Sequence, residues 1–508
     1  MEKKKEKVTL FNRMLNYTEW VGNALPHPAT LFIIFAAGAL VLSWIASISG
    51  WSAIHPGTGE VIYPVNLLSK HGIHQIILKM VSNFTGFAPL GVVLVAVLGL
   101  GVAESSGLID SVIRLLVIKS PKKTLTFVLV LAGVLSNVAA DVGYVLLIPL
   151  AGTVFLAIGR HPIIGMAAAF AGVSGGYSAN LVIGSLDPLL AGLSQEAAGI
   201  LAPGYEVNAM ANYYFMIIST FLIAGLGTFV TEKIVAPRFE TYEGNVEVEE
   251  IRSLDSKERR GLWFTVITLI LLIAVVATGI VPENGFLRGA DGSILDSPLI
   301  EGVIALIFIT FALLGLAYGL ASGNFKNDSD VIAGMSANMK TMAVYIVLVF
   351  FAAQFVAYFK WSHLGEIMAI NGANVLKSIN VGTIPLILSF ILLTCVVNMV
   401  MGSSSAKWAI MAPIFIPLFM QLGYSPELTQ VSYRIGDSVT NLISPMMSYF
   451  ALIIAYFQKY DSKASIGTIV ATMLPYSIVF LIGWAILLTI WIILGLPLGP
   501  EAPLYYTP

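Results

Sequence analysis

The stretch from Asn398 to Pro445 has the sequence NMVMGSSSAKWAIMAPIFIPLFMQLGYSPELTQVSYRIGDSVTNLISP. It is mostly apolar, yet it contains Lys407, Arg434, Asp437 and a triple serine, with glycine and proline at positions that a straight helix disfavours. In lipid such a segment cannot be one uninterrupted helix, because buried charge is costly and backbone groups freed by a break must face protein or water. Broken helices that carry charge and hydroxyl groups at mid-membrane are typical of secondary transporters.

The composition indicates a polytopic membrane protein. Of 508 residues, 57% are hydrophobic and 11% are charged, whereas soluble domains carry roughly a quarter charged residues. The single cysteine, Cys395, excludes an intrachain disulfide bond. The net charge of −2 gives no indication of a nucleic-acid partner. No small-residue cleavage pattern follows the first apolar run, so we expect it to be a retained span.

Apolar runs predict the membrane-spanning helices. Each run is long enough to cross the roughly 30 Å hydrocarbon core as a helix. The runs lie near 30–49, 88–118, 210–230, 262–281, 299–321, 338–359 and 469–495. Three further apolar regions are interrupted: 124–158, 163–193 and 383–456.

An internal duplication relates the interrupted regions. The spacing P-x9-G-x2-P occurs at Pro149, Gly159 and Pro162 and again at Pro413, Gly423 and Pro426. We therefore predict two repeats, 30–230 and 299–495, each with a re-entrant hairpin followed by a discontinuous helix. The hairpins are expected at 124–158 and 383–421, and the broken helices at 163–193, opened at Gly172–Asn180, and 427–456, opened at Gly436–Pro445.

The charges predict the topology. With nine spans and a cytoplasmic amino terminus, most Lys and Arg residues fall on the inner side, as the positive-inside rule requires. The charged segment 231–260 is expected to be a cytoplasmic linker. The two repeats then have opposite orientations, so the predicted fold is a single all-α membrane domain over 1–508 with inverted repeats, about nine transmembrane helices (two of them discontinuous) and two re-entrant hairpins per subunit.

Cation coupling is assigned to polar residues near the predicted breaks. Asp187 and Asp437 are carboxylates at membrane depth, where charge is a candidate functional feature. Asn137, Asn180 and Asp187 are the candidate Na⁺ ligands, since amide oxygens and freed carbonyls bind Na⁺ at unwound segments. A purely structural role stays open for each: amide capping of the breaks for the asparagines, and a local Asp-Pro turn for Asp187.

Substrate binding is assigned mainly to the second repeat. Ser403, Ser404 and Ser405 lie at the presumed hairpin tip, where hydroxyls and exposed amides suit a carboxylate. Trp408 offers a stacking surface for an aromatic solute, although packing is an alternative. Arg434 stands three residues before Asp437, so the two share a helix face and can pair, for function or for structure.

The motifs resemble those of the AbgT family of aminobenzoyl-glutamate transporters. The similar segments are SNVAADVGYVLLIPLAG, AGVSGGYSANLVIGSLDPLLAGLS, GSSSAKWAIMAPIFIPLF and RIGDSVTNLISPMMSYF. The resemblance implies a bowl-shaped homodimer of the ion-transporter superfamily in the bacterial cytoplasmic membrane. It also implies transport of p-aminobenzoyl-glutamate, or export of sulfonamide antimetabolites, driven by a Na⁺ or H⁺ gradient. The implied functional positions are Asp187, Trp408, Arg434, Asp437 and Pro445, with Ser405; Asn441, the counterpart of Asn180, joins the substrate set.

Other functions stay open at this stage. The chain can be a carrier for another carboxylate or dipeptide-like solute, or a passive channel. Ser403–Ser405 with Lys407 also allow a membrane-embedded Ser-Lys amidohydrolase. We expect no cofactor beyond the coupling ion, and we expect a small-molecule substrate and membrane lipid as partners.

Overall fold

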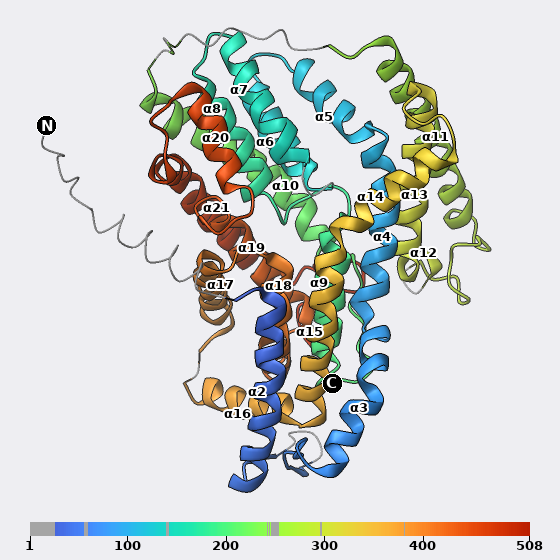
Figure 1. Cartoon of the computed structure of the whole chain (residues 1–508), viewed down its shortest axis with the longest axis vertical. Helices are drawn as coiled ribbons and strands as arrows, with labels where there is room; N and C mark the ends of the chain where they lie inside the picture. The colour runs from blue at the N-terminus through green and yellow to red at the C-terminus, as the bar shows by residue number, and fades with distance from the viewer. Residues whose placement is uncertain are drawn as a thin grey trace, which may run out of the picture.

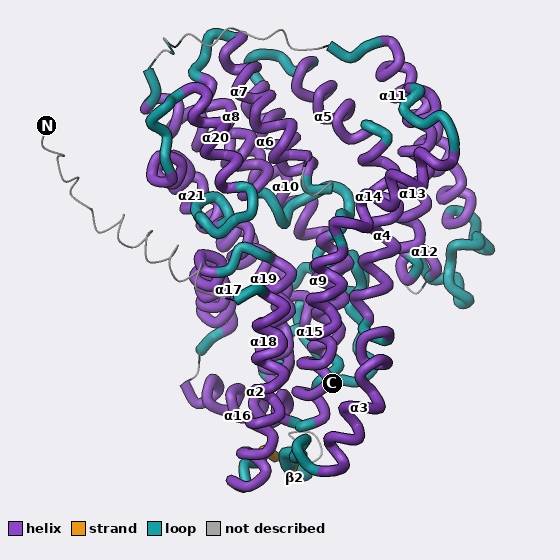
Figure 2. The backbone as a smooth tube through the Cα atoms, viewed as in Figure 1, coloured by secondary structure: helices purple, strands orange, loops and turns teal. Residues whose placement is uncertain are grey.

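The fold is almost entirely helical. The computed structural model describes residues 26–54, 59–138, 142–240, 242, 244, 253–294, 297–379 and 381–507. Within these ranges the only strands are β1 (Ala53–Ile54) and β2 (Val61–Ile62), which pair as a short antiparallel ribbon. Figure 2 shows helices through nearly the whole molecule, joined by short loops.

Eight helical segments of the described chain are long and apolar enough to cross a membrane. They are α2 (Pro28–Ser49), α3 with α4 (Lys70–Thr85 and Ala88–Ser105), α10 (Tyr213–Val230, continued by short turns to Arg238), α11 (Ser256–Ile280), α13 (Val303–Ser322), α15 (Ala343–Trp361), α17 (Thr383–Val400) and α21 (Ile466–Leu494). This finding confirms the all-α polytopic membrane fold. The inverted orientation of the repeats stays a prediction.

Shorter helices fill the space between these spans. They are α5 (Leu108–Ile118), α6 (Leu125–Ser136), α7 (Ile148–Ala157), α8 (Pro162–Phe170), α9 (Leu186–Ala198), α12 (Pro298–Glu301), α14 (Asp328–Thr341), α16 (Leu364–Ile379), α18 (Ser404–Gln421), α19 (Pro426–Thr440) and α20 (Phe450–Tyr460). In Figure 1, α17, α18 and α19 lie near the middle of the molecule, with α5–α8 at one end and α2, α3 and α16 at the other.

The second span differs from its predicted position. The apolar run 88–118 predicted one helix, but a turn after Ser105 separates α4 from α5. The span instead extends towards the amino terminus through α3. Helix α3 contains Lys70, His71 and Lys79, so its sequence does not read as part of the apolar run. Hydropathy therefore placed this span too late in the chain.

Both predicted broken helices contain a non-helical stretch. In the first, α8 is followed by a π-helical turn (Ala171–Gly175), and α9 begins only at Leu186. In the second, α19 ends at Thr440 and α20 begins at Phe450. Gly436, where we expected the second opening to begin, lies inside α19. A Cβ atom there would meet the Ile391 carbonyl oxygen at 2.5 Å, so this glycine permits α17 to pack closely.

The duplicated P-x9-G-x2-P segments form turns of the same kind. Gly159 and Gly423 both have left-handed backbone, with φ of +80° and +88°, which glycine adopts without a steric penalty. Pro162 and Pro426 each begin the following helix, where a missing N–H costs nothing. The two copies therefore share a helix–turn–helix geometry at this spacing.

Parts of two predictions lie outside the described residues. Residues 139–141, inside the predicted hairpin 124–158, are one such part. Most of 241–252 in the predicted linker 231–260 is another. The described ends of that linker are helical: α10 continues through turns to Arg238, and α11 begins at Ser256.

The carboxyl-terminal segment is hydrogen-bonded to the turn between α18 and α19. The Tyr506 amide donates to the Gly423 carbonyl oxygen at 2.9 Å, and the Ser425 amide donates to that of Leu504 at 3.1 Å. The Ser425 hydroxyl also donates to the Pro503 carbonyl oxygen at 2.6 Å. This turn positions α19, which carries Arg434 and Asp437.

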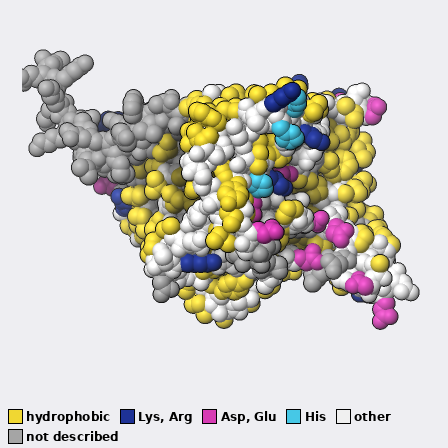
Figure 3. Space-filling view, turned by 90° about the horizontal axis from the view of Figure 1, so that it is seen from below, with side chains coloured by type: hydrophobic (Ala, Val, Ile, Leu, Met, Phe, Trp, Pro, Cys, Tyr) yellow, Lys and Arg dark blue, Asp and Glu magenta, His cyan; other side chains and the backbone are white. Residues whose placement is uncertain are grey.

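The surface is consistent with a lipid environment. Figure 3 shows hydrophobic side chains over much of the view, with charged groups in patches. Helix α11 is the most exposed span; Trp263, for example, is 69% exposed. Isolated apolar side chains are common on soluble proteins, but a whole apolar helix at the surface indicates lipid or another subunit.

Candidate substrate and coupling site

The triple serine begins α18. Ser403 caps the helix, and its hydroxyl accepts from the Ala406 amide at 3.4 Å. Ser404 is buried, whereas Ser403 is exposed and Ser405 is half-buried. A Cβ atom on Gly402 would overlap the Met446 carbonyl group. The glycine therefore allows the start of α18 to lie directly against the turn that follows α19.

A cavity of about 270 Å³ lies at these serines. Its lining comes from the serine segment, from α9 and the non-helical stretch before it, from the turn after α19, from α4, and from Met342 between α14 and α15. The lining residues are Val93, Val97, Tyr177, Ser185, Leu186, Leu189, Met342, Gly402, Ser403, Ser404, Ser405 and Ser448. Its polar side chains are all hydroxyls, and none of the lining residues is charged. Such a surface offers hydrogen bonds to a polar solute against apolar walls.

Asp437 does not line this cavity, but it contacts Ser404, which does. The Ser404 hydroxyl donates to Asp437 Oδ2 at 2.8 Å. Asp437 Oδ1 is 2.5 Å from the ammonium group of Lys407. Both charged side chains are almost completely buried, at 1% and 0% exposure. Ser404 therefore connects the cavity to a buried ion pair.

Asp187 forms a second buried ion pair, with Arg434. Arg434 Nη2 donates to Asp187 Oδ1 at 2.6 Å, and the Gly184 amide donates to Asp187 Oδ2 at 2.7 Å. This contact joins α9 to α19. The predicted pairing of Arg434 with Asp437 is wrong in this structure. Although both residues stand on α19, Arg434 extends to α9, and Asp437 turns to α18.

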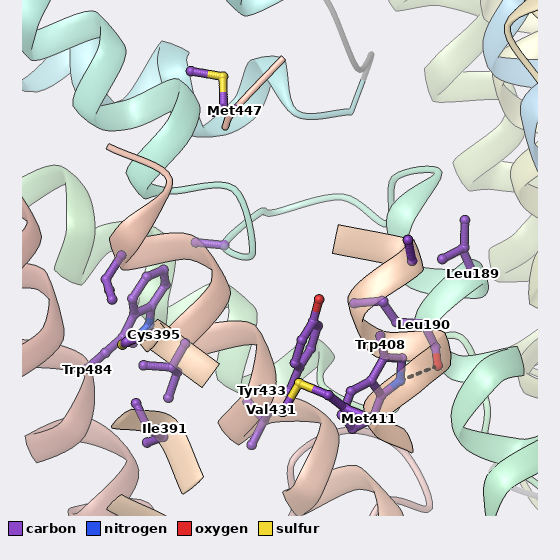
Figure 4. Close-up of a cluster of buried hydrophobic side chains, with 14 of the residues drawn as sticks. Leu189, Leu190, Ile391, Cys395, Trp408, Met411, Val431, Tyr433, Met447 and Trp484 are labelled. Atoms are coloured by element: carbon purple, nitrogen blue, oxygen red, sulfur yellow. Dashed lines mark hydrogen bonds between the residues drawn. The ribbon is translucent and has the colours of Figure 1, made fainter. Parts of the chain in front are cut away.

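Trp408 packs between helices. Its side chain is fully buried and stacks on Tyr433 with ring centres 4.5 Å apart. The indole Nε1 donates to the Ser194 hydroxyl at 3.0 Å. It also donates to the Leu190 carbonyl oxygen at 3.2 Å (Figure 4). The ring does not line the cavity in this conformation. Its contact with a solute stays a prediction.

The candidate Na⁺ ligands differ in the oxygens that they leave available. Asn180 Oδ1 already accepts from the Leu181 and Val182 amides at 2.8 and 3.3 Å, and each Asp187 oxygen has a donor. Asn137 Oδ1 is buried without a hydrogen-bond partner, while its amide donates to the Val134 carbonyl oxygen at 3.2 Å. In this conformation Asn180 caps the break, and Asn137 alone of the three has an oxygen left for an ion.

The remaining second-repeat candidates lie in or beside the turn after α19. Asn441 is buried, and its Oδ1 accepts from Asn398 Nδ2 at 2.9 Å. Pro445 lies within this turn and is half-buried. Neither residue lines the cavity. Any effect on a bound solute in this conformation would be indirect, through the residues that do line it.

Sequence reasoning missed several residues of this site. Tyr177 and Ser185 line the cavity, and both lie in the segment GGYSANLVIGSLDP, which was singled out only for its Asn and Asp. Tyr433, on α19, stacks on Trp408. The available signal was the presence of hydroxyl side chains, those of Tyr177 and Ser185, in a segment predicted to be unwound.

The structure does not support the Ser-Lys hydrolase hypothesis. The ammonium of Lys407 contacts Asn398 and Asp437, and the Ser404 hydroxyl donates to Asp437. The lysine ammonium is thus paired with a carboxylate and is not placed as the base that a serine nucleophile would need.

Comparisons with known proteins agree with a transporter. A family model described as the AbgT putative transporter family matches residues 13–506. The p-aminobenzoyl-glutamate transport protein of Escherichia coli (strain K12) is 36% identical over 489 residues, which cover 96% of each chain.

Two solved structures are similar over their whole length. The YdaH transporter of Alcanivorax borkumensis is 46% identical, with a TM-score of 0.90 over 94% of this chain and 100% of that one. MtrF of Neisseria gonorrhoeae, described within a class of antimetabolite efflux pumps, is 47% identical, with a TM-score of 0.92 over 97% of this chain and 100% of that one. With its helical membrane fold and its buried polar site, this chain belongs to the AbgT family of membrane transporters.

Proposed function

We propose that this protein is a cation-coupled secondary transporter of p-aminobenzoyl-glutamate, related folate breakdown products and sulfonamide antimetabolites. Its place is the bacterial cytoplasmic membrane, as a homodimer with the amino terminus in the cytoplasm. The choice of substrates is supported by the name of the E. coli relative, a p-aminobenzoyl-glutamate transport protein, and by the antimetabolite efflux named for the MtrF class.

The observation that carries the proposal is the connection between the hydroxyl-lined cavity and Asp437. The cavity is bounded by the amino terminus of α18, which has 18 residues. Unsatisfied amides and the helix dipole favour an anion at such an end. With a carboxylate of p-aminobenzoyl-glutamate at the serines, the aromatic ring of the substrate would lie against Val93, Val97 and Leu189.

Ser404 supplies a physical reason for coupling. A serine hydroxyl has one proton to donate, and here it donates to Asp437 Oδ2 at 2.8 Å. When that proton turns to a substrate carboxylate, Asp437 loses a hydrogen bond in a buried site. Because an under-solvated buried carboxylate is costly, a cation near Asp437 becomes more favourable. Substrate and cation therefore promote each other's binding.

The direct test is uptake of radiolabelled p-aminobenzoyl-glutamate into proteoliposomes, with Na⁺ and proton gradients imposed separately. Accumulation under one gradient alone would identify the coupling ion. If the solute does not accumulate, flux of a sulfonamide indicates an exporter, and flux of another carboxylate or a dipeptide indicates a different substrate. Equal flux without any gradient would contradict coupling.

The Ser404→Ala variant tests the coupling route. We expect it to retain substrate binding through Ser403 and Ser405 but to lose at least about 80% of gradient-driven accumulation, because the shared hydroxyl proton is gone. Ser448→Ala, which also removes a hydroxyl from the cavity wall, is the matched control and should keep its gradient dependence. Equal loss in both variants would count against the role of Ser404.

A further inference from the structure

Lys407 is a buried cation that the coupling route above does not use. Its side chain is fully buried on α18. Its ammonium group contacts Asn398 Oδ1 and lies 2.5 Å from Asp437 Oδ1. A buried lysine is costly unless it is paired, so this contact has a structural role at least. Its position also matters for any ion that Asp437 attracts.

The oxygens around the ammonium are held in place. The two hydrogens of Asn398 Nδ2 are shared among three acceptors: the Asp437 carbonyl oxygen at 2.7 Å, Thr440 Oγ1 at 2.8 Å and Asn441 Oδ1 at 2.9 Å. These three acceptors fix which end of the amide carries oxygen and direct Oδ1 towards Lys407. The ammonium therefore lies between an amide oxygen and a carboxylate oxygen, which are the kinds of ligand that a hard monovalent cation takes.

The two buried ion pairs leave no uncompensated negative charge at Asp187 or Asp437. Asp187 is neutralised by Arg434 at 2.6 Å, and Asp437 is neutralised by Lys407. An ion added to these two pairs would bring an uncompensated positive charge into a buried site, which is strongly unfavourable. An ion bound at Asp437 must therefore take the place of the lysine.

We propose that Lys407 is a tethered competitor of the coupling cation. The cation binds to Asp437 and Asn398 only as it displaces the ammonium group, and the ammonium returns when the cation leaves. This inference rests on the proposed cation coupling and adds a residue that weakens cation binding enough for release. A carrier needs such release, since an ion held too tightly is not delivered.

The test measures cation binding without transport. The full-length protein, in detergent at fixed pH and constant ionic strength, is heated in mixtures of NaCl and choline chloride, because a ligand that binds the folded state raises the unfolding temperature with its concentration. The variants are Lys407→Gln, Asp437→Asn and the double variant. Lys377→Gln, on the exposed part of α16, is the matched control. LiCl and KCl series accompany NaCl.

Removal of the competitor should strengthen binding. We expect the half-saturating Na⁺ concentration of Lys407→Gln to be at least tenfold lower than that of the wild type and of Lys377→Gln. The cation effect should vanish in Asp437→Asn and in the double variant. If Lys407→Gln is folded only when a cation is present, that dependence supports the proposal too.

Other outcomes overturn the proposal. An unchanged half-saturating concentration in Lys407→Gln would do so, as would the absence of any response to Na⁺, Li⁺ or K⁺. If Lys407→Gln is unfolded with and without salt while the double variant is folded, the lysine is only a structural partner of Asp437. Since no substrate is used, these results are independent of the uptake assay: failed uptake with the expected cation shifts would contradict the substrate assignment and not the role of Lys407.

Discussion

Two carboxylates in the core receive their positive partners from other helices. Asp187 on α9 pairs with Arg434 on α19, and Asp437 on α19 pairs with Lys407 on α18. The sequence predicted that these charges lie at membrane depth, but not which pairs form. Spacing along one helix places residues on a face; it cannot identify a partner on another helix.

Removal of one partner should destabilise the protein. Asp187→Asn leaves Arg434 buried with no carboxylate, and loss of one member of a buried pair costs about 3–5 kcal/mol. We expect a clear fall in the thermal unfolding temperature of the purified protein. The double variant Asp187→Asn with Arg434→Gln should recover more than half of the loss. A double variant as unstable as the sum of the single variants would show that the two residues do not depend on each other.

Trp408 tests whether a buried ring is a binding residue. Trp408→Phe keeps most of the apolar ring but removes the single Nε1–H that Ser194 and Leu190 share, and a hydrogen bond contributes about 1 kcal/mol. We expect lower stability, by roughly 1–2 kcal/mol, with the KM for substrate within about twofold of wild type. A large rise in KM at unchanged stability would place the indole in contact with substrate during the transport cycle.

At the scale of elements, helix existence was easier to predict than helix ends. Apolar runs identified most spans, because length and hydropathy follow from the thickness of the membrane. The α3–α4 span was placed too late, since its polar first half resembles a loop. Glycine weakens isolated helices, so the sequence predicts a break at Gly436, whereas the close approach of Ile391 gives this glycine a packing role.

The contact between the start of α18 and the turn after α19 can be tested at Gly402. Gly402→Ala places a methyl group against the Met446 carbonyl group, so the two segments must separate. We expect at least a tenfold loss of transport activity, because the cavity lies at this junction. Gly382→Ala, at the other end of α17, has only Pro385 nearby, at 3.8 Å, and should transport normally. Normal transport by Gly402→Ala would mean that the junction is not closed during substrate binding.

At the scale of the whole molecule, the cavity brings together segments from both halves of the chain. Tyr177 and Ser185 come from the first half, and the serine segment and Ser448 come from the second. The duplicated P-x9-G-x2-P spacing predicted that corresponding segments exist. It did not predict that hydroxyls from both would share one cavity, because that depends on how the halves pack.

Cysteine labelling can test whether substrate occupies this cavity. The only native cysteine, Cys395, is 8% exposed, so a maleimide should react slowly with the wild type. Ser405→Cys places a thiol in the cavity wall, and p-aminobenzoyl-glutamate should slow its modification at least threefold. Ser253→Cys, at an exposed position away from the cavity, should react at the same rate with and without the solute. Equal rates for Ser405→Cys would exclude this cavity as the place of binding.

The pairing of Asp187 with Arg434 has a consequence for how the protein inserts into the membrane during its synthesis. The two residues are 247 positions apart, and ribosomes add about 5–20 residues per second. Asp187 therefore emerges roughly 10–50 s before the arginine that will neutralise it. During this interval the first half of the chain lacks the arginine partner of Asp187, and because an unpaired carboxylate is costly inside a bilayer, we expect α9 to reach its final place only after α19 is made. A late helix would then complete the placement of an earlier one, and the order of insertion would differ from the order of synthesis.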